Sequence, residues 1–184
     1  TLLRTAILAC FGRNCEVTQV TDWCALNVRM THPDPVSVFA NEVYAVAVLS
    51  ALKAAPAKEL YENVLEWGFK SKNREKHVLK ALVEASTSPK SNSSPKIACF
   101  LQNAFYQLLH AQTITEGIFS GTEKSFSTEK AACGALLGAA YGEKAFPEEW
   151  KRNLLFSSSR TKRPLDYSPH AVFTIAEKLV FRPE

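Results

Sequence analysis

Three hydroxyl side chains come directly before a helix-forming run near residue 130. They are Ser125, Ser127 and Thr128 in the stretch SFSTEKAACGALLGAAYG. The start of a helix presents free backbone N–H groups and the positive end of the helix dipole. Hydroxyls at such a position can cap the helix, bond to a phosphate or offer oxygen ligands to a metal ion. This segment is therefore the first candidate site in the chain.

The helix that follows carries three glycines at intervals of four residues. Gly134, Gly138 and Gly142 are separated mainly by small or apolar residues, so that one helix face is almost bare backbone. Small residues at this spacing allow close packing. We expect another helix or a bound ligand to approach this face closely.

A second candidate site is the segment MTHPDP, residues 30–35. It is either a plain connection between two helices with Asp34 as the N-cap, or a loop whose prolines hold His32 as a ligand contact. An imidazole can hydrogen-bond a phosphate or a ribose hydroxyl. We expect His77 on a solvent face, His110 at a helix end and His170 at a helix start. No histidine has a second His or Cys at metal-ligand spacing, and no HExxH, GxSxG or P-loop sequence is present.

Helical periodicity dominates the elements that must position these residues, and it predicts an all-α fold. The helix expected at Val36–Ala54 is apolar on nearly every face, so we expect it at the centre, with its large side chains buried. Those side chains are Phe39, Val43, Val46 and Leu49. The other expected helices span Leu2–Phe11, Val17–Arg29, Ala57–Phe69, Arg74–Ala85, Ile97–His110, Glu129–Tyr141, a short proline-initiated helix at FPEEW, and His170–Phe181, with one more short turn at Thr115–Phe119. Residues 86–96 and 157–169 are expected to be loops.

Composition and charge indicate which classes of partner to expect and in which cellular compartment. The net charge of +4 comes from scattered basic residues, with small clusters at 70–80 and 160–163 that we interpret as solvated surface, so we expect no nucleic-acid partner. We find no run of about 18 apolar residues and expect no membrane partner. The five cysteines form no CxxC pair, which favours free thiols in a reducing, intracellular compartment such as the cytoplasm. The first residues resemble the middle of a helix, so we expect the chain to begin partway into a larger fold.

Three segments together resemble the C-terminal part of the ADP-ribosylglycohydrolases. They are LLRTAIL, MTHPDPVSVFANEVYAVAVLSAL and GALLGAAYGEKAFPEEW, in this order and spacing over nearly the whole chain. The family includes the dinitrogenase-reductase-activating glycohydrolases and the J1-type crystallins. The resemblance implies an all-helical, mostly orthogonal bundle with a central cleft for two magnesium ions and ADP-ribose. Residues 1–184 would form a single, partial domain that lacks the N-terminal part of that fold.

The resemblance also carries over particular residues. The family's glycine-aspartate-x-aspartate-threonine metal motif falls on Lys124, Ser125, Ser127 and Thr128, and its ligand-contacting histidine falls on His32. Both aspartates are thus replaced by serine, and the acidic cluster near the family's N-terminus has no counterpart. Magnesium is held by carboxylate charge and strict oxygen geometry. Thr128 is therefore only a remnant of the metal site, and Ser127 or Thr128 is better interpreted as an N-cap, with Glu129 in the first turn.

These departures imply a catalytically degenerate family member that has no assigned catalytic residue and binds ADP-ribose or a protein. One alternative is an active, magnesium-dependent ADP-ribosylhydrolase of the glycosidase class, whose metal ligands come from an absent N-terminal segment or a partner chain. Another is a structural, crystallin-like subunit. The partners implied are ADP-ribose, ADP-ribosylated protein, and a partner chain or second copy that covers the missing part.

Overall fold

In the computed structural model, which describes residues 1–89, 95–120, 127–156 and 171–180, all regular secondary structure is helical. The prediction of an all-α fold is confirmed. The elements are α1 (Leu2–Phe11), α2 (Val17–Arg29), α3 (Pro35–Leu52), α4 (Ala57–Lys70), α5 (Lys76–Glu84), α6 (Lys96–His110), α7 (Ile114–Phe119), α8 (Ser127–Tyr141), the 3-10 turn η1 (Glu143–Ala145), α9 (Glu148–Leu155) and α10 (Val172–Val180).

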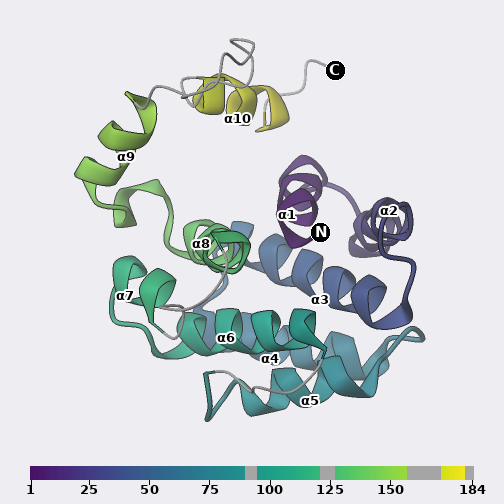
Figure 1. Ribbon diagram of the computed structural model, residues 1–184. Helices are drawn as coiled ribbons and strands as arrows, with labels where there is room; N and C mark the ends of the chain where they lie inside the picture. Colours follow the sequence, from purple (N-terminus) through teal and green to yellow (C-terminus); the bar gives the residue numbers. More distant parts are fainter. Residues whose placement is uncertain (90–94, 121–126, 157–170, 181–184) are drawn as a thin grey trace.

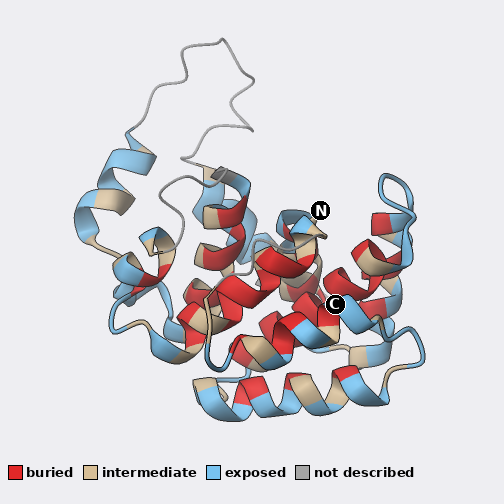
Figure 2. Cartoon of the chain, turned by 60° about the horizontal axis from the view of Figure 1, so that its bottom comes forward, coloured by how far each residue is buried: buried red, intermediate tan, exposed pale blue. Residues whose placement is uncertain are grey.

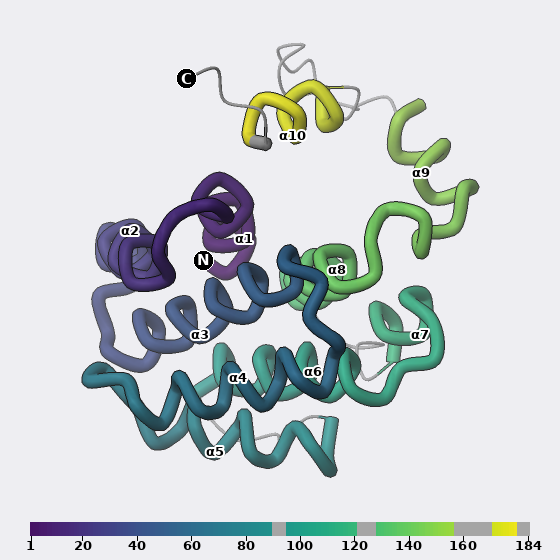
Figure 3. The backbone as a smooth tube through the Cα atoms, turned by 180° about the vertical axis from the view of Figure 1, so that it is seen from behind, coloured from purple at the N-terminus to yellow at the C-terminus, as the bar shows by residue number. Residues whose placement is uncertain are grey.

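Helix α3 lies at the centre of the fold and packs against α1, α2, α4, α5, α6 and α8. In Figure 1, α1 and α2 lie on one side of it and α4, α5 and α6 on the other. Helix α8 is seen nearly end-on there, whereas α3 and α6 run across the page, so α8 crosses them steeply. The view from behind shows the same arrangement (Figure 3). The steep crossing of α8 over α3 and α6 is one orthogonal contact of the kind that the family resemblance implied.

The start of α3 follows from its sequence. The Asp34 side chain accepts a hydrogen bond from the Ser37 backbone N–H at 2.8 Å, and Pro35 is the first helical residue. Both features were expected of a capped, proline-initiated helix. The helix ends at Leu52 rather than Ala54, because Ala54 has a left-handed backbone with φ of 60° that cannot continue a right-handed helix.

The predicted core positions of α3 are confirmed. Phe39, Val43, Val46 and Leu49 are all buried, and Figure 2 shows buried residues along nearly the whole helix. One expectation needs correction, since α3 is long and apolar enough to cross a membrane by length and composition alone. Because most of it is enclosed by neighbouring helices, its apolarity is accounted for by the protein core.

Other helix boundaries also differ from the expectation. Helix α8 already includes Ser127 and Thr128, so neither is the N-cap. The residue before Ser127 lies outside the described ranges. Helix α5 begins at Lys76 rather than Arg74, because Glu75 is extended and leaves Arg74 in the preceding loop. Lys96, expected in a loop, is the first residue of α6.

The glycine face of α8 is covered mainly by side chains. A Cβ atom on Gly134 would lie 3.3 Å from Ile118 of α7, and one on Gly138 would lie 3.1 Å from the Phe146 ring. Gly142 has no such neighbour but adopts φ of 78°, which suits glycine and ends the helix. The expectation of an approaching helix thus holds at Gly134. At Gly138 it is wrong, since an aromatic ring from the chain after η1 fills the space.

We expect Gly138→Leu to lower the free energy of unfolding by about 1–3 kcal/mol, because the added side chain overlaps the position of Phe146. Urea denaturation measures this change. The matched control is Ala131→Leu, at an exposed position of the same helix, which should change stability by about 0.5 kcal/mol or less. Equal effects at the two positions would contradict the close contact at Gly138.

Candidate functional site

The two candidate segments of the sequence meet at one cavity of about 220 Å³, which we term the His32 pocket. His32 comes from the connection before α3, and Thr128 comes from the first turn of α8. The residues that line the pocket are Thr1, Leu2, His32, Ser37, Lys96, Ile97, Phe100 and Thr128. The structure therefore brings together His32 and Thr128, the two residues that the family resemblance marked, although they lie far apart in the chain.

His32 is exposed and is positioned by the end of α2. Its backbone N–H donates to the Val28 carbonyl at 2.8 Å, and its Nδ1 lies 3.0 Å from the Thr31 hydroxyl. Arg4 of α1 donates to the same hydroxyl at 2.9 Å. No described residue hydrogen-bonds the Nε2 atom of His32, so this nitrogen remains available to a ligand hydroxyl or phosphate.

Three helices begin at the His32 pocket. Ser37 lies in the first turn of α3, Lys96 is the first residue of α6, and Thr128 is the second residue of α8. The starts of α6 and α8 contribute the positive ends of their helix dipoles, and Lys96 brings a positive charge to the lining. At α3 the Ser37 N–H is already bonded to Asp34, so that helix start is capped. This electrostatic environment favours an anion, and a phosphate group in particular.

The nearest acidic residue in the chain, Asp34, is engaged in holding α3. Desolvation raises the pKa of its carboxyl group, but the hydrogen bonds from Ser37 and the nearby His32 outweigh it and leave that pKa below its usual value. Asp34 is thus an ionised helix cap, and its carboxylate is not part of the pocket lining.

The donor set at the pocket does not fit magnesium. Among its described lining residues none carries a carboxylate, and no three described His, Cys, Asp or Glu side chains gather as metal ligands. Thr128 can offer only a neutral hydroxyl, whereas magnesium binds through carboxylates in octahedral geometry. Ser125 lies outside the described residues, and of Ser127 only the helical backbone is described. Glu129 is 1% exposed and does not line the pocket.

The side chains that line the His32 pocket also indicate what catalysis the pocket could support. Glycoside hydrolysis generally requires two carboxyl groups, one acting as acid and the other as base or nucleophile. The described lining of the His32 pocket supplies an imidazole, hydroxyls and an ammonium group instead. Those groups can bind and orient an anionic sugar ligand by hydrogen bonds, without a carboxylate pair to cleave it.

The remaining sequence candidates lie away from this pocket. His77 is exposed, as expected, and lies beside α6 in a different cavity. His110 closes α6, with its Nε2 atom 2.9 Å from the Ser86 carbonyl oxygen. His170 falls outside the described residues. All five cysteines are free thiols, as predicted, and burial raises the pKa of Cys24 and Cys133 to about 12.

Sequence reasoning missed Ser37, Lys96 and Phe100 as parts of the site. Ser37 could have been found from the sequence, because it lies one helical turn after the Asp34 cap and only five residues after His32. Lys96 had none, because its role depends on where α6 begins and on the packing of α6 beside α3 and α8.

Comparison with known proteins agrees with the all-helical fold. The model of the ADP-ribosylglycohydrolase family matches residues 1–179, which is essentially the whole chain. A search of curated proteins found none that matches. Because the family match spans the segments that form the core helix and both sides of the His32 pocket, the chain belongs to the ADP-ribosylglycohydrolase family.

Proposed function

We propose that this chain is a catalytically degenerate ADP-ribosylglycohydrolase family member that binds ADP-ribose at the His32 pocket without hydrolysing it. The observation that carries the proposal is the meeting of His32 with three helix N-termini and Lys96, in a lining without a described carboxylate. ADP-ribose combines a diphosphate with ribose hydroxyls. Helix N-termini and a lysine suit the diphosphate, and an imidazole and hydroxyls suit the sugar.

The size of the pocket limits what it encloses. Its volume of about 220 Å³ is below the roughly 300–1,000 Å³ typical of sites that bury a whole small molecule. We therefore assign only part of the ligand to it, namely the diphosphate with an adjoining ribose. The adenine would lie outside this cavity.

The absence of turnover follows from the donor chemistry rather than from the fold. Two serines stand where the family has metal-binding aspartates, and Lys96 adds positive charge to the described lining. Bound cations are disfavoured where helix N-termini and a lysine converge. ADP-ribose binding should therefore be independent of magnesium.

Calorimetric titration of the full chain with ADP-ribose tests this function. We expect saturable binding whose affinity is unchanged by a chelator. The variant His32→Ala should weaken the affinity by roughly tenfold or more, because a hydrogen bond to a charged group is lost. His77→Ala is the matched control, as this exposed histidine lines a different cavity, and it should leave the affinity unchanged. Failure of the unmodified chain to bind ADP-ribose, or equal losses in both variants, would refute the proposal.

A further inference from the structure

A second cavity borders the same connection that carries His32. It measures about 290 Å³, and we term it the Arg74 pocket. His32 lines the first pocket, whereas Pro33 and Pro35 line the second. The full lining is Arg29, Pro33, Pro35, Val38, Lys72, Asn73, Arg74 and Glu75. These residues come from the end of α2, the start of α3 and the loop between α4 and α5.

Positive charge is concentrated at this pocket. Arg29, Lys72 and Arg74 are exposed, and none of them forms an ion pair with another described residue. The lysines of α4 differ: Lys58 pairs with Glu62 and Lys70 with Glu66, each one helical turn away. The charges of the three cations at the Arg74 pocket are not offset by such pairs.

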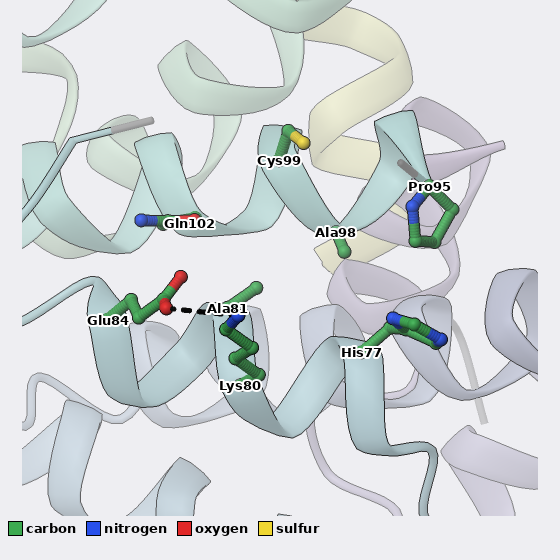
Figure 4. A pocket seen from close by; sticks show the side chains of 8 residues that line it. All are labelled: His77, Lys80, Ala81, Glu84, Pro95, Ala98, Cys99 and Gln102. Atoms are coloured by element: carbon green, nitrogen blue, oxygen red, sulfur yellow. Dashed lines mark ion pairs between the residues drawn. The ribbon is translucent and has the colours of Figure 1, made fainter. Parts of the chain in front are cut away.

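The cavity between α5 and α6 provides a contrast (Figure 4). Its lining also includes a lysine, Lys80, but that lysine pairs with Glu84 at 3.6 Å. Both partners line the same cavity, so their charges offset each other. At the Arg74 pocket three cations face a single carboxylate in the lining, that of Glu75.

The buried carboxylate of Glu42 anchors the loop between α4 and α5. Glu42 of α3 is 3% exposed, and its Oε1 accepts a hydrogen bond from the Asn73 amide at 3.0 Å. Desolvation raises the pKa of Glu42, helped by Asp22, whereas the Asn73 hydrogen bond and the charge of Arg29 act to lower it. Asn73 is therefore tied to the core between Lys72 and Arg74, which holds both cations at the rim of the cavity.

We propose that the Arg74 pocket is a phosphate-binding site, separate from the His32 pocket, for a small phosphate-bearing anion. The planar guanidinium groups of Arg29 and Arg74 can each donate two parallel hydrogen bonds to a tetrahedral oxyanion, and Lys72 adds a third positive charge. Pro33 and Pro35 add conformationally restricted residues to the lining. Within the described lining, the three cations outnumber the single carboxylate of Glu75, and a phosphate would offset that excess.

Titration of the full chain with inorganic phosphate or glycerol phosphate, followed by amide NMR spectra, tests the site. We expect saturable shifts at the backbone amides of residues 72–75. The double variant Lys72→Gln with Arg74→Gln should weaken binding by roughly tenfold or more, because charge-assisted hydrogen bonds are lost. Tighter binding of glycerol phosphate would identify an organic phosphate as the ligand, and equal or tighter binding of inorganic phosphate would identify the free anion.

The control removes the same charge elsewhere. Lys53→Gln with Lys58→Gln changes two exposed lysines that do not line the pocket, and it should leave phosphate affinity within about twofold. His32→Ala should leave the phosphate-dependent shifts at residues 72–75 unchanged, which separates this site from the proposed ADP-ribose site. Absence of saturable shifts at millimolar phosphate, equal weakening by the control pair, or loss of the shifts at residues 72–75 in His32→Ala would overturn the proposal.

Discussion

Replacing Ser125 and Ser127 together with aspartate is expected to raise the affinity of the chain for magnesium by roughly tenfold or more, without creating hydrolytic activity. The substitutions add two carboxylates at the positions onto which the family resemblance places the metal motif, just before Thr128 in the sequence. Charge and oxygen ligands are what the segment lacks, so ion binding should respond. Catalysis by a two-metal site requires both ions to be held, and the second acidic cluster of the family has no counterpart in these residues.

Calorimetry with magnesium chloride measures the first effect, and release of ADP-ribose from an ADP-ribosylated protein measures the second. Ser86→Asp with Ser88→Asp is a matched control, because it adds two carboxylates at the same spacing beyond the end of α5. We expect that control to leave magnesium affinity nearly unchanged. An equal gain in magnesium affinity in the control would contradict a specific site at residues 125–128, because any two added carboxylates would then have the same effect.

Magnesium-stimulated release of ADP-ribose by the unmodified chain would overturn the degenerate assignment altogether. It would favour the alternative of an active, magnesium-dependent ADP-ribosylhydrolase. Other oxygen ligands would then have to replace the family's aspartates.

Leu49→Ala is expected to lower the free energy of unfolding by about 2–5 kcal/mol. Leu49 is 2% exposed in the central helix α3, so its removal loses apolar burial and leaves a cavity that the surrounding helices can only partly fill. Urea or thermal denaturation followed by circular dichroism gives the value.

Leu52→Ala provides the comparison on the same helix, because Leu52 is 37% exposed at the last position of α3. It should cost about 1 kcal/mol or less, since less apolar surface leaves water there. A small effect at Leu49, or the same effect at both positions, would show that α3 does not form the core as described.

Local features of the sequence determined most of the helices. Asp34 followed by Pro35 specifies a helix start, and the unbroken apolar run after it requires burial on all sides. Both signals act over a few neighbouring residues, so they survive in the folded chain. The prediction at the end of this helix was wrong, because the left-handed backbone of Ala54 is not encoded by an alanine.

Packing between distant segments decided what covers the glycines of α8. The spacing of Gly134 and Gly138 indicated an open face, but it could not specify the Ile118 side chain or the Phe146 ring that fills it. The spacing reports only where side chains are missing. Which atoms enter the gap depends on the turn after α8 and on the position of α7.

The sequence by itself determined the family, the all-helical class and the two residues, His32 and Thr128, that mark the candidate site. Only the tertiary structure showed that three helix N-termini and Lys96 converge on those residues. It also showed that the basic cluster interpreted as solvated surface contains Lys72 and Arg74, which line a cavity with Arg29. The physical reason is the same in both cases. Helical periodicity describes each segment's own faces, whereas the electrostatic potential at a pocket is a sum over charges and dipoles that only folding brings close together.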